Sequence, residues 1–343
     1  MILTALSFAV TLVDCPILIN LALGLNINTQ QPSIMSQLYS NCCSASGVTC
    51  DSNSRVTQIA WAFMNLDGWI NGSSLPPLLT QLDVSVNSLT GNIPLSWPNT
   101  MTSIIVGDNY LSGTFVPPTT WPPNLATFIF GFNFISGTVP SVWPAGLTYM
   151  DINQNPMYCN SPTWPPAIVE LHINGLGCTG DSPVFPSTLK ILFLGWGPER
   201  TSHNKFSGTL VLNQPTFLDI SYNLITNLII ADTSVLTSGN CDLSYNPLLN
   251  SPSIVNLTMC TENGLYSPYS LPYTISSKIH ATHTFSSKIH STPTNISSKL
   301  ASTQRQVAEI KRTRDIGLHS SKRIAMNASS LQSHRSDTFS TCK

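Results

Sequence analysis

The stretch LTQLDVSVNSLTGNIP, residues 79–94, decides the fold because its spacing recurs along the chain. Its pattern is LxxLxLxxNxLxGxIP, with the asparagine at Asn87. The alternation of Leu82 and Val84 with their neighbours predicts a short strand that buries two side chains. The rest of the unit must then turn and climb to begin the next strand alongside. Because one such unit cannot bury its own apolar face, the stretch predicts a stack of units.

Nine positions share the register of Asn87, at intervals of 21 to 26 residues. They are Met64, Asn87, Asn109, Asn133, Asn155, Leu176, Gly197, Asn223 and Asn246. This spacing, with Ser or Thr before a Gly in the second half of the unit, is the plant-type leucine-rich-repeat pattern. We therefore predict an α/β repeat fold over residues 56–264: a right-handed solenoid of about nine coils with a parallel sheet on its concave face. The 26-residue interval indicates an insertion near residue 200, after which Asn204 resumes the coil.

The segment of residues 14–55, before the repeats, contains NCCSASGVTCD. Its matching residues are Cys42, Cys43, Gly47, Val48, Cys50 and Asp51. The segment resembles the N-terminal cap of plant-type extracellular leucine-rich-repeat proteins, a class that includes receptor-like proteins and polygalacturonase-inhibiting proteins. Ala45 or Ser46 stands where that family usually has Trp. The resemblance implies the bridges Cys15–Cys42 and Cys43–Cys50, whereas four cysteines alone permit three pairings.

The remaining cysteines and one apolar run complete the expectations for the two ends of the repeats. Residues 17–25 have the spacing of one amphipathic helix, followed by a polar spacer. A Cys241–Cys260 bridge would close the last coil, Cys159 and Cys178 lie one coil apart and are the next candidate pair, and Cys342 is left over.

Charge and composition divide the chain into a body and a tail. Residues 1–264 hold four basic and thirteen acidic side chains, a net charge of −9, whereas residues 265–343 hold eleven basic and three acidic, a net charge of +8. The 265–343 tail is rich in Ser and Thr and poor in large apolar residues, which predicts disorder. Its alternative interpretations are an O-glycosylated stalk, a contact to wall polyanions or an unselected extension.

An extracellular location is predicted from three features. Residues 1–13 are an uncharged apolar run, interpreted as a signal peptide; a continuous N-terminal membrane anchor is the disfavoured alternative. Cysteine usage indicates an oxidising compartment. Asn71 and Asn256 are candidate glycosylation sites because both begin Asn-X-Ser/Thr sequons.

Four Trp-Pro pairs recur on the limb that returns to each new strand. They begin at Trp97, Trp121, Trp143 and Trp164. We interpret them as a packing spine whose prolines keep the limb extended. The alternative is a ring-stacking carbohydrate surface on the convex side.

Outward residues of the concave sheet are the candidate binding site. They fall in fixed columns, one between the two buried strand positions and one just before the Asn position. The candidates are Asp83, Asp108, Phe132, Asp151, His172, Trp196, Asp219, Tyr222, Asp242 and Tyr245. The segments LDISYN and CDLSYN are close to the repeat consensus, so repeat template is an alternative explanation for their Asp and Tyr residues. His172, Trp196, Phe132 and Asp108 depart from the template.

The sequence favours non-enzymatic recognition of an extracellular protein or cell-wall polysaccharide. The alternatives are inhibition of a secreted hydrolase and a structural or adhesive role in a cell wall. Asp151 and His172 share a column on neighbouring coils, but no Ser or Cys in a strained elbow accompanies them. The sequence shows no phosphate loop and no metal-ligand spacing, and we expect no cofactor, metal or nucleic-acid partner. It defines no oligomeric state.

Overall fold

The computed structural model describes residues 13–159, 162–195, 204–236, 240–247 and 260. Contacts divide the chain into residues 1–271 and 272–343, and every described residue belongs to the first unit. Several predictions therefore concern positions outside the described residues. These are the signal peptide up to residue 12, Trp196 and Gly197, the rest of the insertion to residue 203, Asn256, and the 265–343 tail with Cys342.

The cap that precedes the repeats is helical over more of its length than we predicted. The structure contains three helices and a short 3-10 turn where the sequence indicated one helix and a spacer. Their bounds are α1 Cys15–Gly24, α2 Ile27–Gln30, α3 Pro32–Asn41 and η1 Cys42–Ser44. The spacer prediction was wrong because Ile34, Met35 and Leu38 give α3 a buried stripe, and Pro32 suits its first turn.

Two disulfides and one ion pair fasten the cap to itself and to the first coil. The bridges are Cys15–Cys42 and Cys43–Cys50, the pairing that the resemblance implies. Asp14 is fully buried, and its carboxylate accepts hydrogen bonds from the Arg55 guanidinium, at 3.0 Å for Nε and Nη2, and from the Val56 N–H at 2.9 Å. A buried carboxylate needs such partners, so Asp14 ties the start of α1 to the first long strand.

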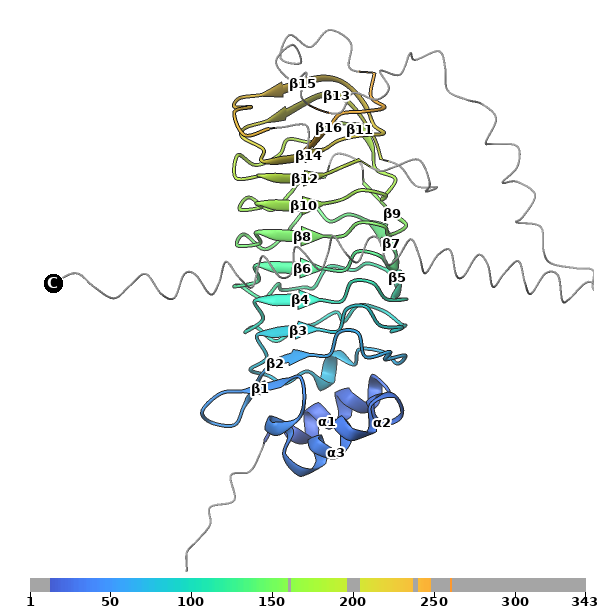
Figure 1. The fold of residues 1–343 in the computed structure, drawn as a ribbon, viewed down its shortest axis with the longest axis vertical. Helices are drawn as coiled ribbons and strands as arrows, with labels where there is room; N and C mark the ends of the chain where they lie inside the picture. Colours follow the sequence, from blue (N-terminus) through green and yellow to red (C-terminus); the bar gives the residue numbers. More distant parts are fainter. Residues whose placement is uncertain (1–12, 160–161, 196–203, 237–239, 248–259, 261–343) are drawn as a thin grey trace, which may run out of the picture. The chain divides into compact units, whose positions relative to one another are not determined.

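Ten strands form the main sheet, one per coil after the first hairpin. β1 (Val48–Cys50) pairs antiparallel with β2 (Val56–Ala60), and every later pairing is parallel. The later strands are β3 Gln81–Asp83, β4 Ser103–Ile105, β6 Thr127–Ile129, β8 Tyr149–Asp151, β10 Glu170–His172, β12 Ile191–Phe193, β14 Phe217–Asp219 and β16 Cys241–Asp242. Figure 1 shows them stacked in chain order, with the helices at the β1 end. The predicted leucine-rich-repeat solenoid is confirmed.

Two short parallel sheets are formed by the second halves of the coils. They are β5–β7–β9 and β11–β13–β15, and both lie away from the main sheet (Figure 1). Their bounds are β5 Ser112–Thr114, β7 Phe134–Thr138, β9 Met157–Tyr158, β11 Thr179–Asp181, β13 Lys205–Leu212 and β15 Leu224–Ile230. In the first coil the equivalent segment forms the isolated parallel bridge Trp69–Thr90, and the 3-10 turn η2 (Gly72–Ser74) follows it.

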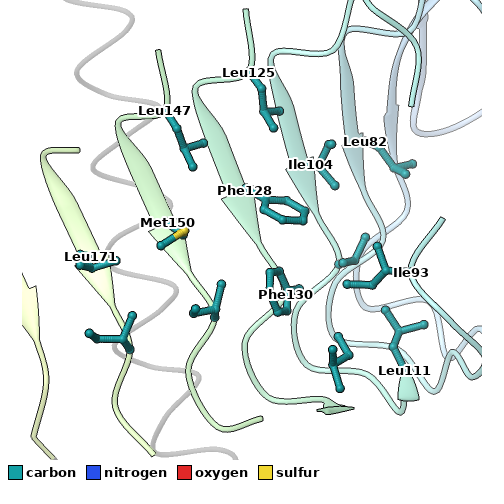
Figure 2. Close-up of a cluster of buried hydrophobic side chains, with 14 of the residues drawn as sticks. Leu82, Ile93, Ile104, Leu111, Leu125, Phe128, Phe130, Leu147, Met150 and Leu171 are labelled. Carbon is teal, nitrogen blue, oxygen red and sulfur yellow. The ribbon is translucent and has the colours of Figure 1, made fainter. Parts of the chain in front are cut away.

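The core runs continuously between these sheets. Leu82, Ile104, Phe128 and Met150 come from four successive strands, and all are at most 1% exposed. Figure 2 shows these side chains in line. Each coil therefore buries its apolar residues against the coil before and the coil after, as the repeat spacing predicts.

A ladder of buried asparagines closes the ends of the strands. Asn109 is typical: its Nδ2 donates to the carbonyls of Val84, Val106 and Gly107, and its Oδ1 accepts the Leu89 N–H. The same role falls to Asn87, Asn133, Asn155, Asn204, Asn223 and Asn246. Asn204, rather than the predicted register position Gly197, serves its coil, because its Nδ2 reaches Ile173 O and Leu194 O. The insertion delays the asparagine without removing it.

The recurrent tryptophans pack inside the solenoid. Trp97, Trp143 and Trp164 are between 6% and 8% exposed, and Trp121 is half-buried with its ring centroid 5.7 Å from that of Trp143. Buried rings cannot stack on a carbohydrate, so the packing interpretation holds and the convex carbohydrate surface does not.

Two further disulfides lie in the repeats, Cys159–Cys178 and Cys241–Cys260. The second joins β16 to residue 260 at the far end of the described solenoid. Among the described helices, none has the length and apolar character needed to cross a membrane.

Candidate binding face on the main sheet

The side of the main sheet turned away from the core carries two aligned columns of side chains, and we call it the outer face. In the three-residue strands β3, β4, β6, β8, β12 and β14 the middle residue is buried and its two neighbours are on the other face, because successive side chains alternate across a strand. The parallel register places equivalent residues side by side, about 4.8 Å apart from one strand to the next. The column at the carboxyl ends of the strands reads Asp83, Ile105, Ile129, Asp151, His172, Phe193, Asp219 and Asp242.

Four candidate aspartates on this face shape the strand ends. The Oδ1 of Asp83, Asp151, Asp219 and Asp242 each accepts the backbone N–H of the residue two positions later, at 2.9 to 3.0 Å. Ser85 and Ser221 add their hydroxyls to Asp83 and Asp219. This bond forms a local turn that starts the loop after the strand. The repeat-template explanation therefore accounts for one carboxylate oxygen of each residue.

The column just before the asparagines has a common backbone conformation that the sequence did not reveal. Asp108, Phe132, Tyr222 and Tyr245 have φ between 54° and 58°, and all four side chains are half-buried. Positive φ in residues other than Gly is uncommon, and its recurrence shows that the loop geometry is imposed by the coil. The rings of Tyr222 and Tyr245 stack with centroids 4.0 Å apart, so the register aligns this column as well.

The densest cluster on the outer face surrounds His172, which is 7% exposed. Its Nε2 lies 2.8 Å from Glu170 Oε1, whereas its Nδ1 lies 3.8 Å from Asp151 Oδ2, beyond hydrogen-bond range. The sequence predicted the neighbouring pair Asp151 and His172 but missed the closer partner, Glu170. The signal was available in the alternation of the strand, because residues 170 and 172 must share a face.

Aromatic rings continue the cluster along the sheet. The His172 ring centroid lies 5.6 Å from that of Tyr149 on β8 and 4.3 Å from that of Phe193 on β12, and Phe193 lies 4.6 Å from Phe217 on β14. Tyr149 and Phe217 stand in the column at the amino ends of the strands, which our prediction did not consider. The structure thus brings together aromatic side chains from four adjacent coils.

Burial shifts the protonation of three groups on this face. It raises the pKa of the Asp151 carboxyl, which His172 partly opposes and Glu170 reinforces. It likewise raises the pKa of Tyr149, with additional effects from Asp151 and Glu170. It also raises the pKa of Asp219, against hydrogen bonds from Ser221 that lower it. Burial therefore disfavours the charged form of Asp151, so a cation brought to this part of the face would stabilise the carboxylate.

Two oxygens beside this cluster lack a hydrogen-bond donor among the described residues. Asn153 and Asn174 are 6% and 7% exposed, and the Oδ1 of each is buried without a donor. A Cβ added at Gly131 would clash with both Asn153 Oδ1 and Asp151 Oδ1, so these two acceptors flank the same space. Over the described part of the chain, no three His, Cys, Asp or Glu side chains are arranged to hold a metal ion.

Comparison with known proteins identifies the fold of the chain and assigns it no activity. No protein-family model matches the sequence. The PEPR1–AtPEP1 crystal structure aligns with a TM-score of 0.52 at 22% identity, over 68% of this chain and 35% of that chain. The chain has the fold of plant leucine-rich-repeat ectodomains. Two Arabidopsis thaliana structures also align with this leucine-rich-repeat chain. They are the BIR2 ectodomain (26% identity, TM-score 0.37, covering 42% of this chain and 81% of that one) and the BIR3–SERK2 complex (23%, 0.35, 43% and 96%).

Proposed function

We propose that this leucine-rich-repeat protein is a secreted or cell-surface recognition protein. It binds an extracellular protein, peptide or wall glycan through the outer face and catalyses no reaction on it. The observation that carries the proposal is the aligned cluster of Tyr149, Glu170, His172, Phe193 and Phe217. Aromatic and charged side chains brought together on one rigid face are typical of binding hot spots.

Further observations support an extracellular binding role. Four disulfides suit an oxidising compartment. The structure of the same fold contains PEPR1 together with AtPEP1. Strands β8, β10 and β12 contribute neither Ser nor Cys beside His172, so the described cluster offers its imidazole no nucleophile to activate.

The test is a binding screen with the full chain. The immobilised protein is exposed to secreted proteins, peptides and wall polysaccharides, and each bound species is titrated against variants. His172→Ala and Phe193→Ala should weaken binding at least tenfold, because they remove rings from the centre of the face. Phe134→Ala is the matched control, since Phe134 is an exposed ring of β7, on a sheet away from the outer face.

Three results would overturn the proposal. The first is that no species binds. The second is that Phe134→Ala, rather than the outer-face variants, abolishes binding. The third is turnover of a bound species. Inhibition of a secreted hydrolase that depends on His172 would specify the kind of partner and keep the same surface.

A further inference from the structure

We infer that the outer face recognises a cationic side chain, a Lys ammonium or an Arg guanidinium, of a peptide or protein partner. The receiving group is the acceptor patch, defined as Asp151 and Asn153 of the β8 coil and Glu170 and Asn174 of the β10 coil. The inference deepens the proposed function and rests on it, because it names the chemistry that the face selects.

The first support is an excess of hydrogen-bond acceptors. Asp151 Oδ1 is used by the Asn153 N–H and Glu170 Oε1 by the His172 ring, which leaves the second oxygen of each carboxylate for another donor. The buried Oδ1 atoms of Asn153 and Asn174 have no donor in the described residues. A buried acceptor without a donor is unfavourable, so a ligand that supplies a donor is favoured at each oxygen it satisfies.

The second support is charge. The strands β6, β8, β10 and β12 carry no Lys or Arg, as their sequences TFI, YMD, ELH and ILF show. Lys190, just before β12, donates instead to Gln214 Oε1 at 2.9 Å. Burial raises the pKa of Asp151 despite the opposing effect of His172, so a cationic partner would favour its carboxylate form.

The third support is geometry. Asn153 Oδ1 and Asp151 Oδ1 both lie against Gly131, because a Cβ there would clash with both of them. The rings of Tyr149, His172 and Phe193 lie along the same strands, and aromatic faces attract Lys and Arg. A cation donates hydrogen bonds and accepts none, so it matches the two carboxylates and the two amide oxygens that lack a donor. A sugar hydroxyl would bring a further acceptor, which makes a neutral glycan the weaker match.

The test uses small probes on the full chain. Acetyl-arginine amide and acetyl-lysine amide are titrated by NMR while the ring resonances of His172 and Phe193 are followed. The neutral counterparts, acetyl-citrulline amide and acetyl-norleucine amide, are titrated in parallel. We expect saturable shifts for a cationic probe and at least tenfold weaker binding of its neutral counterpart.

Matched variants locate the effect. Asp151→Asn with Glu170→Gln keeps the oxygens that accept from Asn153 N–H and from His172, so the fold is preserved while two charges are lost. This variant should weaken binding of the cationic probe at least tenfold, and Asn153→Ala should weaken it severalfold. Asp67→Asn with Asp181→Asn removes the same charge from outside the outer face and should change binding less than twofold.

Several outcomes would refute the inference. The first is equal binding of the charged and neutral probes. The second is an equal loss of binding in the two double variants. The third is that the ligand displaced from the patch is a neutral oligosaccharide instead of a cation. If a partner still binds through His172 and Phe193 while the cationic probes do not, the acceptor-patch inference fails and the proposed function stands. If the probes bind but no partner does, the proposed function fails.

Discussion

Replacement of one ladder asparagine tests how the coils are joined. In Asn109→Ala four hydrogen bonds are lost, but most of the partners keep a second bond. Val84 O still accepts from Asn87 Nδ2 at 2.9 Å, Val106 O from Asn133 Nδ2 at 3.1 Å, and Gly107 O from the Val86 N–H at 3.1 Å. The Leu89 N–H alone loses its acceptor.

The magnitude follows from this count. One buried donor without a partner costs about 1–3 kcal/mol, and three weakened carbonyl interactions add about 0.5 kcal/mol each. We therefore expect Asn109→Ala to lower the free energy of unfolding by about 2.5–4.5 kcal/mol. Urea unfolding followed by far-UV circular dichroism measures this value, provided that the slope with denaturant is unchanged. Amide hydrogen exchange locates the damage at Leu89.

The control is Asn124→Ala, at an exposed asparagine outside the ladder, which should change stability by less than about 0.5 kcal/mol. A loss below about 1 kcal/mol in Asn109→Ala, with the Leu89 amide still protected, would refute the assignment of the ladder as a main connection between coils. An equal loss in the two variants would refute it as well.

Three further predictions concern stability. Asp219→Asn should flatten the pH dependence of stability. Because the folded-state pKa of Asp219 is raised, the folded protein binds more protons than the unfolded chain at pH values just above the usual Asp range. The free energy of unfolding of the unmodified protein therefore falls as the pH rises through this range. Urea midpoints from pH 4 to 8 should show less decline in the variant, and an unchanged profile would contradict the assignment. Asp14→Ala should lower the thermal midpoint more than Asp51→Ala, since it leaves the Arg55 side chain and the Val56 N–H without their buried acceptor; equal midpoints would count against it. Removing the Cys159–Cys178 bridge, 19 residues apart, by Ala at both positions should cost about 3 kcal/mol by loop entropy, measured by urea unfolding, and a loss below 1 kcal/mol would contradict this.

The repeat spacing predicted most of the fold because the same positions of each unit are buried in its neighbours. Leu82 and Val84 are buried, Asn87 turns inward, and the same positions hold in coil after coil. Spacing failed where one coil departs from the template. The sequence indicated that Asn204 resumes the coil after the insertion, and only the structure shows which carbonyls it reaches, whereas α3 was missed because its polar residues obscured Ile34 and Leu38.

The candidate site was predicted less completely because it depends on contacts across strands. The repeat register predicted that His172 and Asp151 stand side by side in one column. The hydrogen-bond partner of the His172 ring, however, is Glu170 on the same strand. Asn153 and Asn174 gave no signal, since only burial without a donor distinguishes them from other loop asparagines. The positive φ of Tyr222 and Tyr245 was likewise hidden, because Tyr itself does not favour that conformation.

The repeat pattern of the solenoid is interrupted at one position. Leu176 occupies the register where its neighbours have asparagine, and the lateral sheets break at the same place, between β9 and β11. Cys159–Cys178 crosses this break covalently. The main sheet and the core continue past this break, so the bridge reinforces the boundary that the lateral sheets leave open, and a reductant that opens it should loosen the coils on either side first. The acceptor patch spans the same boundary, so a partner bound there should offset part of that loss.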